Sequence, residues 1–270
     1  MNEITSPPVR YMGSKFSVAK WIISHFPEHY SYIEPFCGGA SVLFRKQRSR
    51  VEVINDLNQE VVNFFDVLRD RSEELQRALT FTPFSRFELR RAHEVHRDPL
   101  ERARRFYIRS WQKFNGGSEG HLGSWRFATE ETATSPIGDW RKRCLEIPLF
   151  AERLRNVYID CDTAVAVINR FDKPTALFYC DPPYVLDTRT TRSIYQSEMT
   201  DEDHETLSEY LHGIQGMALI SGYNGPLYQR LYADWKMVTT KAFATQRIAR
   251  TECLWINENA LKRQSQKCLF

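Results

Sequence analysis

Cysteine is scarce in this 270-residue chain, and none of it is arranged for metal binding. The six cysteines form no Cys-x-x-Cys pair and no zinc-ligand spacing; they are Cys37, Cys144, Cys161, Cys180, Cys253 and Cys268. We therefore expect reduced thiols, no disulfides and no bound metal, as in a cytosolic protein.

Long apolar runs are also missing. No stretch approaches the length that a bilayer-spanning helix needs. Residues 1–7 lack the basic and apolar regions of a signal peptide, and the chain has no repeats or low-complexity tracts. We expect a cytoplasmic protein without a membrane partner. An aromatic content of 13% allows a substantial core, in one large domain or one domain with an insertion.

The net charge is only +3, but it is unevenly distributed. Residues 69–126 contain twelve Arg and one Lys against eight acidic residues. Guanidinium groups bind phosphate and guanine in a bidentate manner, which favours contact with nucleic acid. The alternative is an ordinary solvated helical face.

Strand-like runs alternate with helical segments, which indicates an α/β fold with a mainly parallel sheet. The strand candidates are residues 30–34, 51–55, 157–161, 175–180 and 217–221, with 236–240 and 252–256 as a closing antiparallel pair. Helices are predicted at 41–47, 58–68 and 200–211, the last capped by Thr200.

Residues 69–150 interrupt this alternation. Helices are predicted at 71–79 and 99–114, followed by a Gly-rich loop over 115–126. We interpret 69–150 as an insertion with its own function, and 1–68 together with 151–270 as the main domain.

The most informative motif is Asp181-Pro182-Pro183-Tyr184, which follows the apolar run 176–180. Prolines make a rigid turn and leave carbonyl groups free to accept hydrogen bonds. The motif thus places a carboxylate, carbonyls and an aromatic face at the carboxyl edge of the sheet, where such folds bind ligands. An exocyclic amino group on a flat base requires these features. The alternative is a Pro-rich loop with an incidental acid.

Three further motifs carry weaker signals. The Gly-rich turn in 34–41 follows the first strand, where glycine lets a ligand approach the backbone, although many such turns are only structural. Asp56 follows the second strand and suits the hydroxyls of a ribose, or it caps the helix at Asn58. Lys15, at the start of a helix, could hold a ligand carboxylate.

Taken in order, these motifs resemble the Dam-like DNA adenine-N6 methyltransferases. The matching segments are 11–15, 34–41, 55–58, 181–184, 220–224 and 247–257, so that the resemblance extends from about residue 9 to 257. In that family the target-recognition insertion lies between the second-strand acid and the Asp-Pro-Pro-Tyr motif, as it does here. Ala40 departs from the pattern, because many relatives have glycine at that place.

The resemblance implies a Rossmann-like methyltransferase fold with a helical DNA-recognition insertion. It implies transfer of a methyl group from S-adenosyl-L-methionine to adenine N6 in double-stranded DNA, with S-adenosyl-L-homocysteine as product and no metal. Because N6 is inaccessible inside a duplex, the base must be flipped out.

The resemblance also implies roles for individual residues. Tyr11, Lys15, Phe36, Gly38, Asp56, Asp162 and Asp181 would bind the cofactor. Asp56 would accept from the ribose hydroxyls, and Asp162 from the adenine amino group of the cofactor. The alternative for Asp162 is a helix cap before Ala164.

Asp181 and the carbonyl of Pro182 would accept the two hydrogens of the target amino group, and Tyr184 would stack on the base. Arg109 and Lys113, with Asn115, flank the Gly-rich loop and are the candidates for contact with DNA.

Two other activities stay open at this stage. One is methylation of cytosine N4 or of a glutamine amide, although those enzymes more often carry Ser or Asn before Pro-Pro-Tyr. The other is a catalytically silent DNA-binding regulator on the same fold. A cognate restriction enzyme is a conceivable partner, and the target sequence is not predicted.

Overall fold

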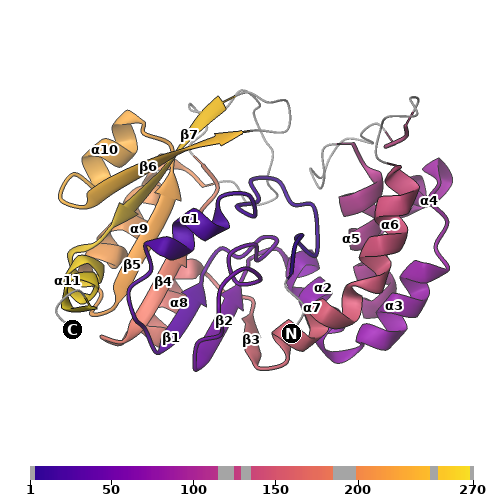
Figure 1. Cartoon of the computed structure of the whole chain (residues 1–270), viewed down its shortest axis with the longest axis horizontal. Coiled ribbons are helices and arrows are strands. Elements are labelled where there is room, and N and C mark those ends of the chain that lie inside the picture. Colours follow the sequence, from indigo (N-terminus) through magenta and orange to yellow (C-terminus); the bar gives the residue numbers. More distant parts are fainter. Residues whose placement is uncertain (1–3, 115–124, 129–134, 185–198, 244–248, 268–270) are drawn as a thin grey trace.

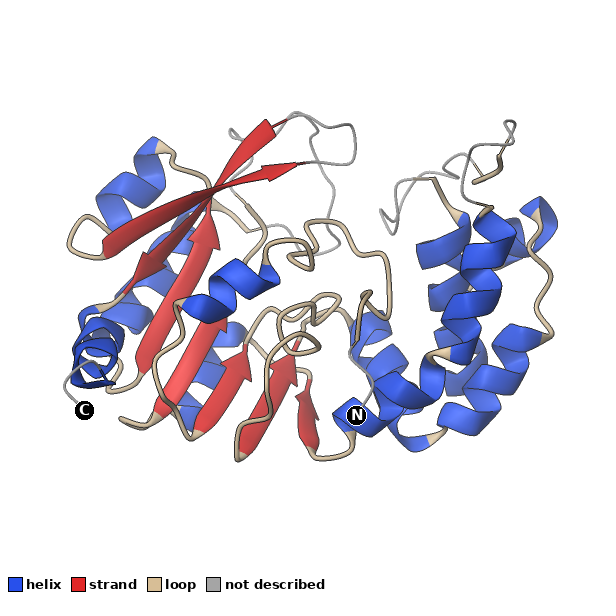
Figure 2. Cartoon of the chain, viewed as in Figure 1, coloured by secondary structure: helices blue, strands red, loops and turns tan. Residues whose placement is uncertain are grey.

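The computed structural model describes residues 4–114, 125–128, 135–184, 199–243 and 249–267. Its centre is a sheet of seven strands in the order β3-β2-β1-β4-β5-β7-β6, flanked by helices (Figure 2). The predicted α/β class is confirmed. None of the described helices is long and apolar enough to cross a membrane.

Five strands are parallel and two are antiparallel. The parallel strands are β1 (Ser31–Glu34), β2 (Val51–Asn55), β3 (Val157–Asp160), β4 (Ala176–Cys180) and β5 (Met217–Gly222). The antiparallel strands are β6 (Lys236–Phe243) and β7 (Ala249–Ile256), and β7 joins the sheet beside β5. The predicted closing pair is confirmed and is longer than predicted.

Alternate residues of each strand pack against opposite faces of the sheet. In β4, Leu177 and Tyr179 face one apolar cluster, whereas Phe178 and Cys180 face another. The first cluster includes side chains of α1 (Ala19–Ser24), α2 (Gln59–Asp70) and α11 (Glu258–Lys267). The second includes side chains of α8 (Ala164–Phe171), α9 (Asp201–Gly213) and α10 (Pro226–Leu231).

Polar side chains begin the longer helices. Asn58 caps α2 by accepting from the backbone N–H of Glu60. Thr200 begins α9 with a reciprocal capping box that involves Asp203, which confirms the predicted cap. Each such cap satisfies N–H groups that the helix itself leaves without a partner.

The insertion forms a separate group of helices beyond the β3 edge of the sheet (Figure 1). Its helices are α3 (Ser72–Thr80), α4 (Arg86–Arg91), α5 (Pro99–Gln112), α6 (Pro136–Leu145) and α7 (Ile147–Leu154). Phe64 of α2 contacts both Phe106 and Tyr107 of α5, so the insertion shares the first apolar cluster with the sheet. The division placed between residues 150 and 151 falls inside α7, and the two-part organisation stays a proposal.

One predicted helix is wrong. Residues 41–47 form successive turns instead of a helix. The backbone N–H of Leu43 donates to Oε1 of Glu34 at 2.7 Å rather than to a carbonyl four residues earlier. Because the buried carboxylate removes this donor from the helical pattern, the segment is held against the end of β1.

Candidate active site

The site lies at the point where the order of the strands in the sheet reverses. β1 and β4 are neighbours, but β2 lies outside β1 and β5 lies outside β4. The connections that follow β1 and β4 therefore diverge, which opens a crevice at the carboxyl ends of these strands. The Gly-rich turn and the Asp181 motif follow these two strands, as the sequence predicted.

Asp181 lies at the end of the fully buried strand β4 and contacts a residue from the start of the chain. Lys15 Nζ lies 3.1 Å from Asp181 Oδ1 and 3.8 Å from Glu252 Oε2. The side chain of Lys15 is only 6% exposed, and that of Asp181 is 20% exposed. The structure thus brings two predicted site residues together and adds Glu252.

The carboxyl group of Asp181 ionises less readily than that of an exposed aspartate. Burial raises its pKa to about 6, Glu252 adds to the rise, and the ammonium group of Lys15 opposes it. At neutral pH the group is mainly a carboxylate, which can accept hydrogen bonds but cannot donate them.

The ring of Tyr184 is held from several directions. Its hydroxyl donates to Glu252 Oε2 at 3.0 Å, and the ammonium group of Lys15 lies 4.5 Å from the ring centroid. Tyr223, which follows β5, meets the ring edge to face at 4.5 Å. The ring is therefore fixed beside Asp181.

The Gly-rich turn lies directly under Tyr11. Gly38 has a φ of +47°, and a Cβ atom placed there would lie 2.9 Å from Cδ1 and Cε1 of Tyr11. Ser14 and Ser41 join the same two segments by a hydroxyl contact of 2.7 Å. Ala40 also has a positive φ, +48°, in the left-handed region that favours glycine. The predicted cofactor residues Tyr11 and Gly38 are thus in contact.

We expect Gly38→Ala to lower the melting temperature. The left-handed conformation costs a non-glycine residue about 1–2 kcal/mol, and the new methyl group would displace Tyr11. Gly213→Ala is the matched control, because a Cβ atom there meets nothing within 4 Å. Calorimetric scans of both variants test this; equal melting temperatures would contradict the assigned packing of the turn.

Asp56 holds the backbone of the turns that follow β1 and β2. Its Oδ2 accepts from the N–H of Gly38 at 2.8 Å, and its Oδ1 accepts from the N–H of Asn58 at 2.9 Å. The residue that caps α2 is Asn58, so the alternative of Asp56 as the cap is wrong. Burial raises the pKa of Asp56. Each carboxylate oxygen has a further lone pair for a ligand.

Asn55 connects three strand ends, a role that the sequence did not predict. Its Nδ2 donates to the carbonyls of Pro35 and Asp162 at 2.8 and 2.9 Å. Its Oδ1 accepts from the N–H of Asp162 at 2.8 Å. This single amide fixes the loops after β1, β2 and β3 relative to one another.

The carboxylate of Asp162 lies at the outer end of this edge and pairs with an arginine. Arg170 Nη2 lies 2.8 Å from Asp162 Oδ2, which lowers the pKa of that carboxyl group. The cap of α8 is Thr163, whose hydroxyl accepts from Ala166, so the alternative role of Asp162 as a cap is wrong. Its role toward a cofactor stays a prediction.

Glu34 is the last residue of β1, and Phe36 lies in the turn that follows. Phe36 is half-buried against the second apolar cluster. Glu34 is buried; its Oε1 accepts from the hydroxyl of Tyr32 and from the N–H of Leu43, each at 2.7 Å. Burial raises the pKa of Glu34 to about 7.

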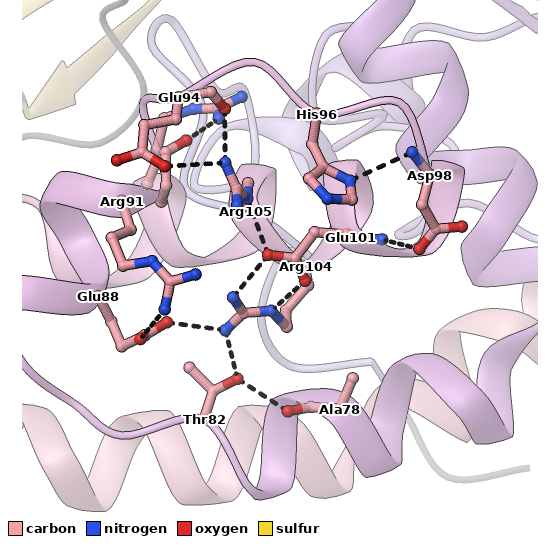
Figure 3. Close-up of polar contacts among 12 residues, drawn as sticks. Ala78, Thr82, Glu88, Arg91, Glu94, His96, Asp98, Glu101, Arg104 and Arg105 are labelled. Atoms are coloured by element: carbon pink, nitrogen blue, oxygen red, sulfur yellow. Dashed lines mark hydrogen bonds and ion pairs between the residues drawn. The ribbon is translucent and has the colours of Figure 1, made fainter.

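Most arginines of the insertion are used inside the fold. Within the described residues, eight of the twelve form ion pairs: Arg69, Arg71, Arg91, Arg102, Arg104, Arg105, Arg109 and Arg126. Figure 3 shows Arg104 between Glu88 and Glu101; Arg104 donates to both oxygens of Glu101, and Arg105 shares Oε1 with it. The arginine excess therefore stabilises the helices, and few guanidinium groups remain for a ligand.

The predicted DNA contacts lie at the end of α5. Arg109 is 14% exposed; it donates to the carbonyl of Ala92 and lies 3.5 Å from Glu60. Lys113 is buried and forms an isolated bridge with Trp125. Asn115 lies outside the described residues. All three stay predictions.

Sequence reasoning missed Glu252 and Tyr223 as site residues. Both lie in segments that resemble the family, which was the only available signal. Glu252 is 237 positions from Lys15, so no local spacing connects them. Among the described residues, no group of three or more His, Cys, Asp or Glu side chains could hold a metal ion.

Comparisons with known proteins identify the family of the chain. The family model described as D12 class N6 adenine-specific DNA methyltransferase matches residues 11–246. A DNA adenine methylase of Salmonella typhi is 24% identical over 86% of this chain and 86% of its own length. A DNA N-6-adenine-methyltransferase of Escherichia phage P1 is 25% identical over 89% of this chain and 33% of its own. The type II methyltransferase M1.LlaDCHI of Lactococcus lactis is 23% identical over 88% of each.

Proposed function

Because the chain belongs to the D12 class N6 adenine-specific DNA methyltransferases, its reaction is methylation of adenine in DNA, and we propose how its own residues perform it. The target adenine is flipped out of the duplex into the crevice between β1 and β4. There Asp181 and the carbonyl of Pro182 accept its two amino hydrogens, and Tyr184 stacks on its ring. The observation that carries this proposal is the arrangement of Asp181, Lys15 and Tyr184 at the point where the order of the strands reverses.

The residues around the Gly-rich turn fit S-adenosyl-L-methionine as the methyl donor. Gly38 lets the turn pack closely under Tyr11, Asp56 offers lone pairs for ribose hydroxyls, and Lys15 offers a cation for a carboxylate. Tyr11 and Phe36 contribute apolar surface, and Asp162 an acceptor at the outer end. When bound, this cofactor supplies a methyl group on a positively charged sulfur.

Asp181 makes the target nitrogen a better nucleophile. The lone pair of an exocyclic amino group is delocalised into the base. Two acceptors on its hydrogens favour the form in which the lone pair is localised on nitrogen. Positive charge develops on N6 during transfer, and a preorganised carboxylate stabilises it. Asp181 need not be a strong base, because the proton becomes acidic once the nitrogen is alkylated.

The competing functions have less support. A silent regulator would have no need for an ionised carboxylate held beside an aromatic ring at this edge. Cytosine N4 methylation does not agree with the family, whose description names adenine. The name of the Lactococcus relative motivates a cognate restriction enzyme as a partner, which stays a prediction.

Expression in a host that lacks adenine methylation tests the proposed function. Methylation-aware sequencing should find N6-methyladenine at one recurring sequence, and this would also reveal the target site. Cells that carry Asp181→Ala should show none. Unmethylated adenine throughout the genome of cells that contain folded wild-type protein would contradict the proposal.

We expect the methylation rate to rise with pH through about 6. Burial raises the pKa of Asp181 to about 6 from an ordinary 3.8, so protonation below that pH removes the acceptor. At pH 5 about one tenth of the groups would be ionised, and kcat/KM should fall by about tenfold, since kcat/KM reports the free enzyme. Initial rates between pH 5 and 8 test this, and a flat profile would contradict it.

Arg86 is our candidate for a phosphate contact in the insertion. It is exposed, it lies 5.8 Å from the ring of Trp125, and it forms no ion pair with another described residue. Arg86→Ala should weaken binding to every DNA sequence and reduce the slope of log affinity against log salt by about one. Arg77→Ala, an exposed arginine of α3 that is also without an acidic partner among the described residues, is the control. Equal slopes for both variants and the wild type would contradict this assignment.

A further inference from the structure

Glu252 occupies an unusual place in the fold. It lies on β7, opposite Thr240 of β6, in the hairpin that closes the sheet. Its side chain is 14% exposed and reaches across to the start of the chain and to the loop after β4. One oxygen, Oε2, meets both the hydroxyl of Tyr184 and the ammonium group of Lys15. Three segments far apart in sequence therefore converge on this atom.

The charges of Asp181, Glu252 and Lys15 do not cancel. Asp181 and Glu252 bring two carboxylates, and Lys15 brings one ammonium group that lies 3.1 Å from the first and 3.8 Å from the second. A shared cation weakens the negative charge of Asp181 less than a cation paired with Asp181 alone. With both carboxylates ionised, the group keeps a net negative charge at the place where positive charge develops during methyl transfer.

The orientation of Tyr184 depends on the same carboxylate. The hydroxyl bond to Glu252, the edge of Tyr223 and the ammonium group of Lys15 restrain the ring from three sides. Of the three contacts, the bond to Glu252 holds the ring by its far end, where the hydroxyl also interacts with Asp181. Without it, the ring could tilt away from the plane that a flipped base would occupy.

We propose that Glu252 is a positioning residue of the methyl-transfer site: it shares Lys15 with Asp181, so that Asp181 stays a strong acceptor, and it fixes the ring of Tyr184. This inference rests on the proposed roles of Asp181 and Tyr184. It assigns to the closing hairpin a direct part in preparing the acceptor for chemistry.

Other ionisable groups also face Asp181 and must be considered in its pH dependence. They are Lys15 before α1, Glu34 of β1, Tyr179 and Cys180 of β4, Tyr184, Tyr228 of α10 and Glu252. Burial raises the pKa of the three tyrosines and the cysteine well above neutrality. Burial also raises the pKa of Glu34 to about 7, but its carboxylate is occupied by Tyr32 and Leu43.

The decisive variant is Glu252→Gln, which keeps an oxygen for the hydroxyl of Tyr184 and removes the charge. Steady-state methylation of polymerase-amplified, unmethylated duplex DNA should show kcat lowered by about tenfold at pH 8. In the profile of rate against pH, the fall on the acidic side (the acid limb) should move to lower pH by about one unit. The reason is that a like charge beside Asp181 has been removed. The ratio of wild-type to variant rate should therefore shrink as the pH falls.

Glu258→Gln is the matched control, since it makes the same change on an exposed carboxylate six residues later. It should keep the wild-type kcat and pH profile. Wild-type rates and an unmoved acid limb in Glu252→Gln would overturn the inference, as would a loss that is equal at every pH. Inactive wild-type protein would instead count against the proposed function itself.

Tyr184→Phe tests the second half of the inference independently of the charge. It keeps the ring and removes the hydroxyl, which donates to Glu252 and also interacts with the carboxylate of Asp181. We expect KM for DNA to rise by about three- to tenfold, the scale of one ordinary hydrogen bond. The fall in rate at low pH should begin at a higher pH, because the lost hydroxyl also lowers the pKa of Asp181. A wild-type KM would show that Glu252 does not orient the ring.

Discussion

Asp181→Ala should lower the methylation rate by at least about a hundredfold, the scale for losing one preorganised polar partner. The carboxylate lies at the end of β4, beside Lys15 and Tyr184; Glu252, the other carboxylate that contacts these two residues, comes from β7. Affinity for S-adenosyl-L-methionine should change little, because the lost acceptor serves the target amino group. Single-turnover rates and calorimetric titration separate the two effects.

Asp181→Asn and Asp201→Ala serve as comparisons for this variant. The first preserves the shape of the side chain and should also be severely impaired, since it loses the charge. The second removes an exposed carboxylate at the start of α9 and should remain active. Near-normal turnover in Asp181→Ala would remove Asp181 from the chemistry.

Tyr184→Ala should lose most of its activity, whereas Tyr184→Phe should keep much of it. Stacking of a base on an aromatic ring is worth roughly 1–3 kcal/mol, and phenylalanine retains that surface. The structure supports the role because the ring lies beside Asp181, held by Glu252 and Tyr223. Tyr158→Ala, an exposed tyrosine on β3, is the control and should behave like wild type.

An oligonucleotide with 2-aminopurine at the target position reports base flipping directly. Its fluorescence should rise on binding to the wild type, because leaving the stack relieves quenching. It should rise further with Tyr184→Ala, which cannot stack on the extruded base. If the alanine and phenylalanine variants differed only in melting temperature, with an equal ratio of turnover to DNA binding, Tyr184 would be a packing residue.

Motifs at the carboxyl ends of strands were the predictable part of this molecule. A buried strand followed by a polar turn is a local pattern, and parallel strands bring all such turns to one edge. Asp56, Gly38 and Asp181 could therefore be placed together before the fold was known. The capping box at Thr200 was predictable for the same reason, since its partner lies three residues away.

Contacts between distant segments could not be predicted. Glu252 meets Lys15 and Tyr184 only because β7 joins the sheet beside β5. The arginines of the insertion include one pairing that the sequence could predict and one that it could not. The pairing of Arg105 with Glu101 follows from a spacing of four on one helix, but that of Arg109 with Glu60 requires α2 and α5 to pack together. The sequence does not reveal such distant acidic partners, so the arginine excess by itself favoured a DNA-binding surface.

The most direct test of the account identifies the modified nucleoside. Polymerase-amplified duplex DNA would be incubated with purified protein and S-adenosyl-L-methionine, digested to nucleosides and analysed by mass spectrometry. The account predicts N6-methyladenine with the wild type, and none with Asp181→Ala. N4-methylcytosine, or no methylated nucleoside from folded wild-type protein on DNA that contains its target sequence, would contradict it.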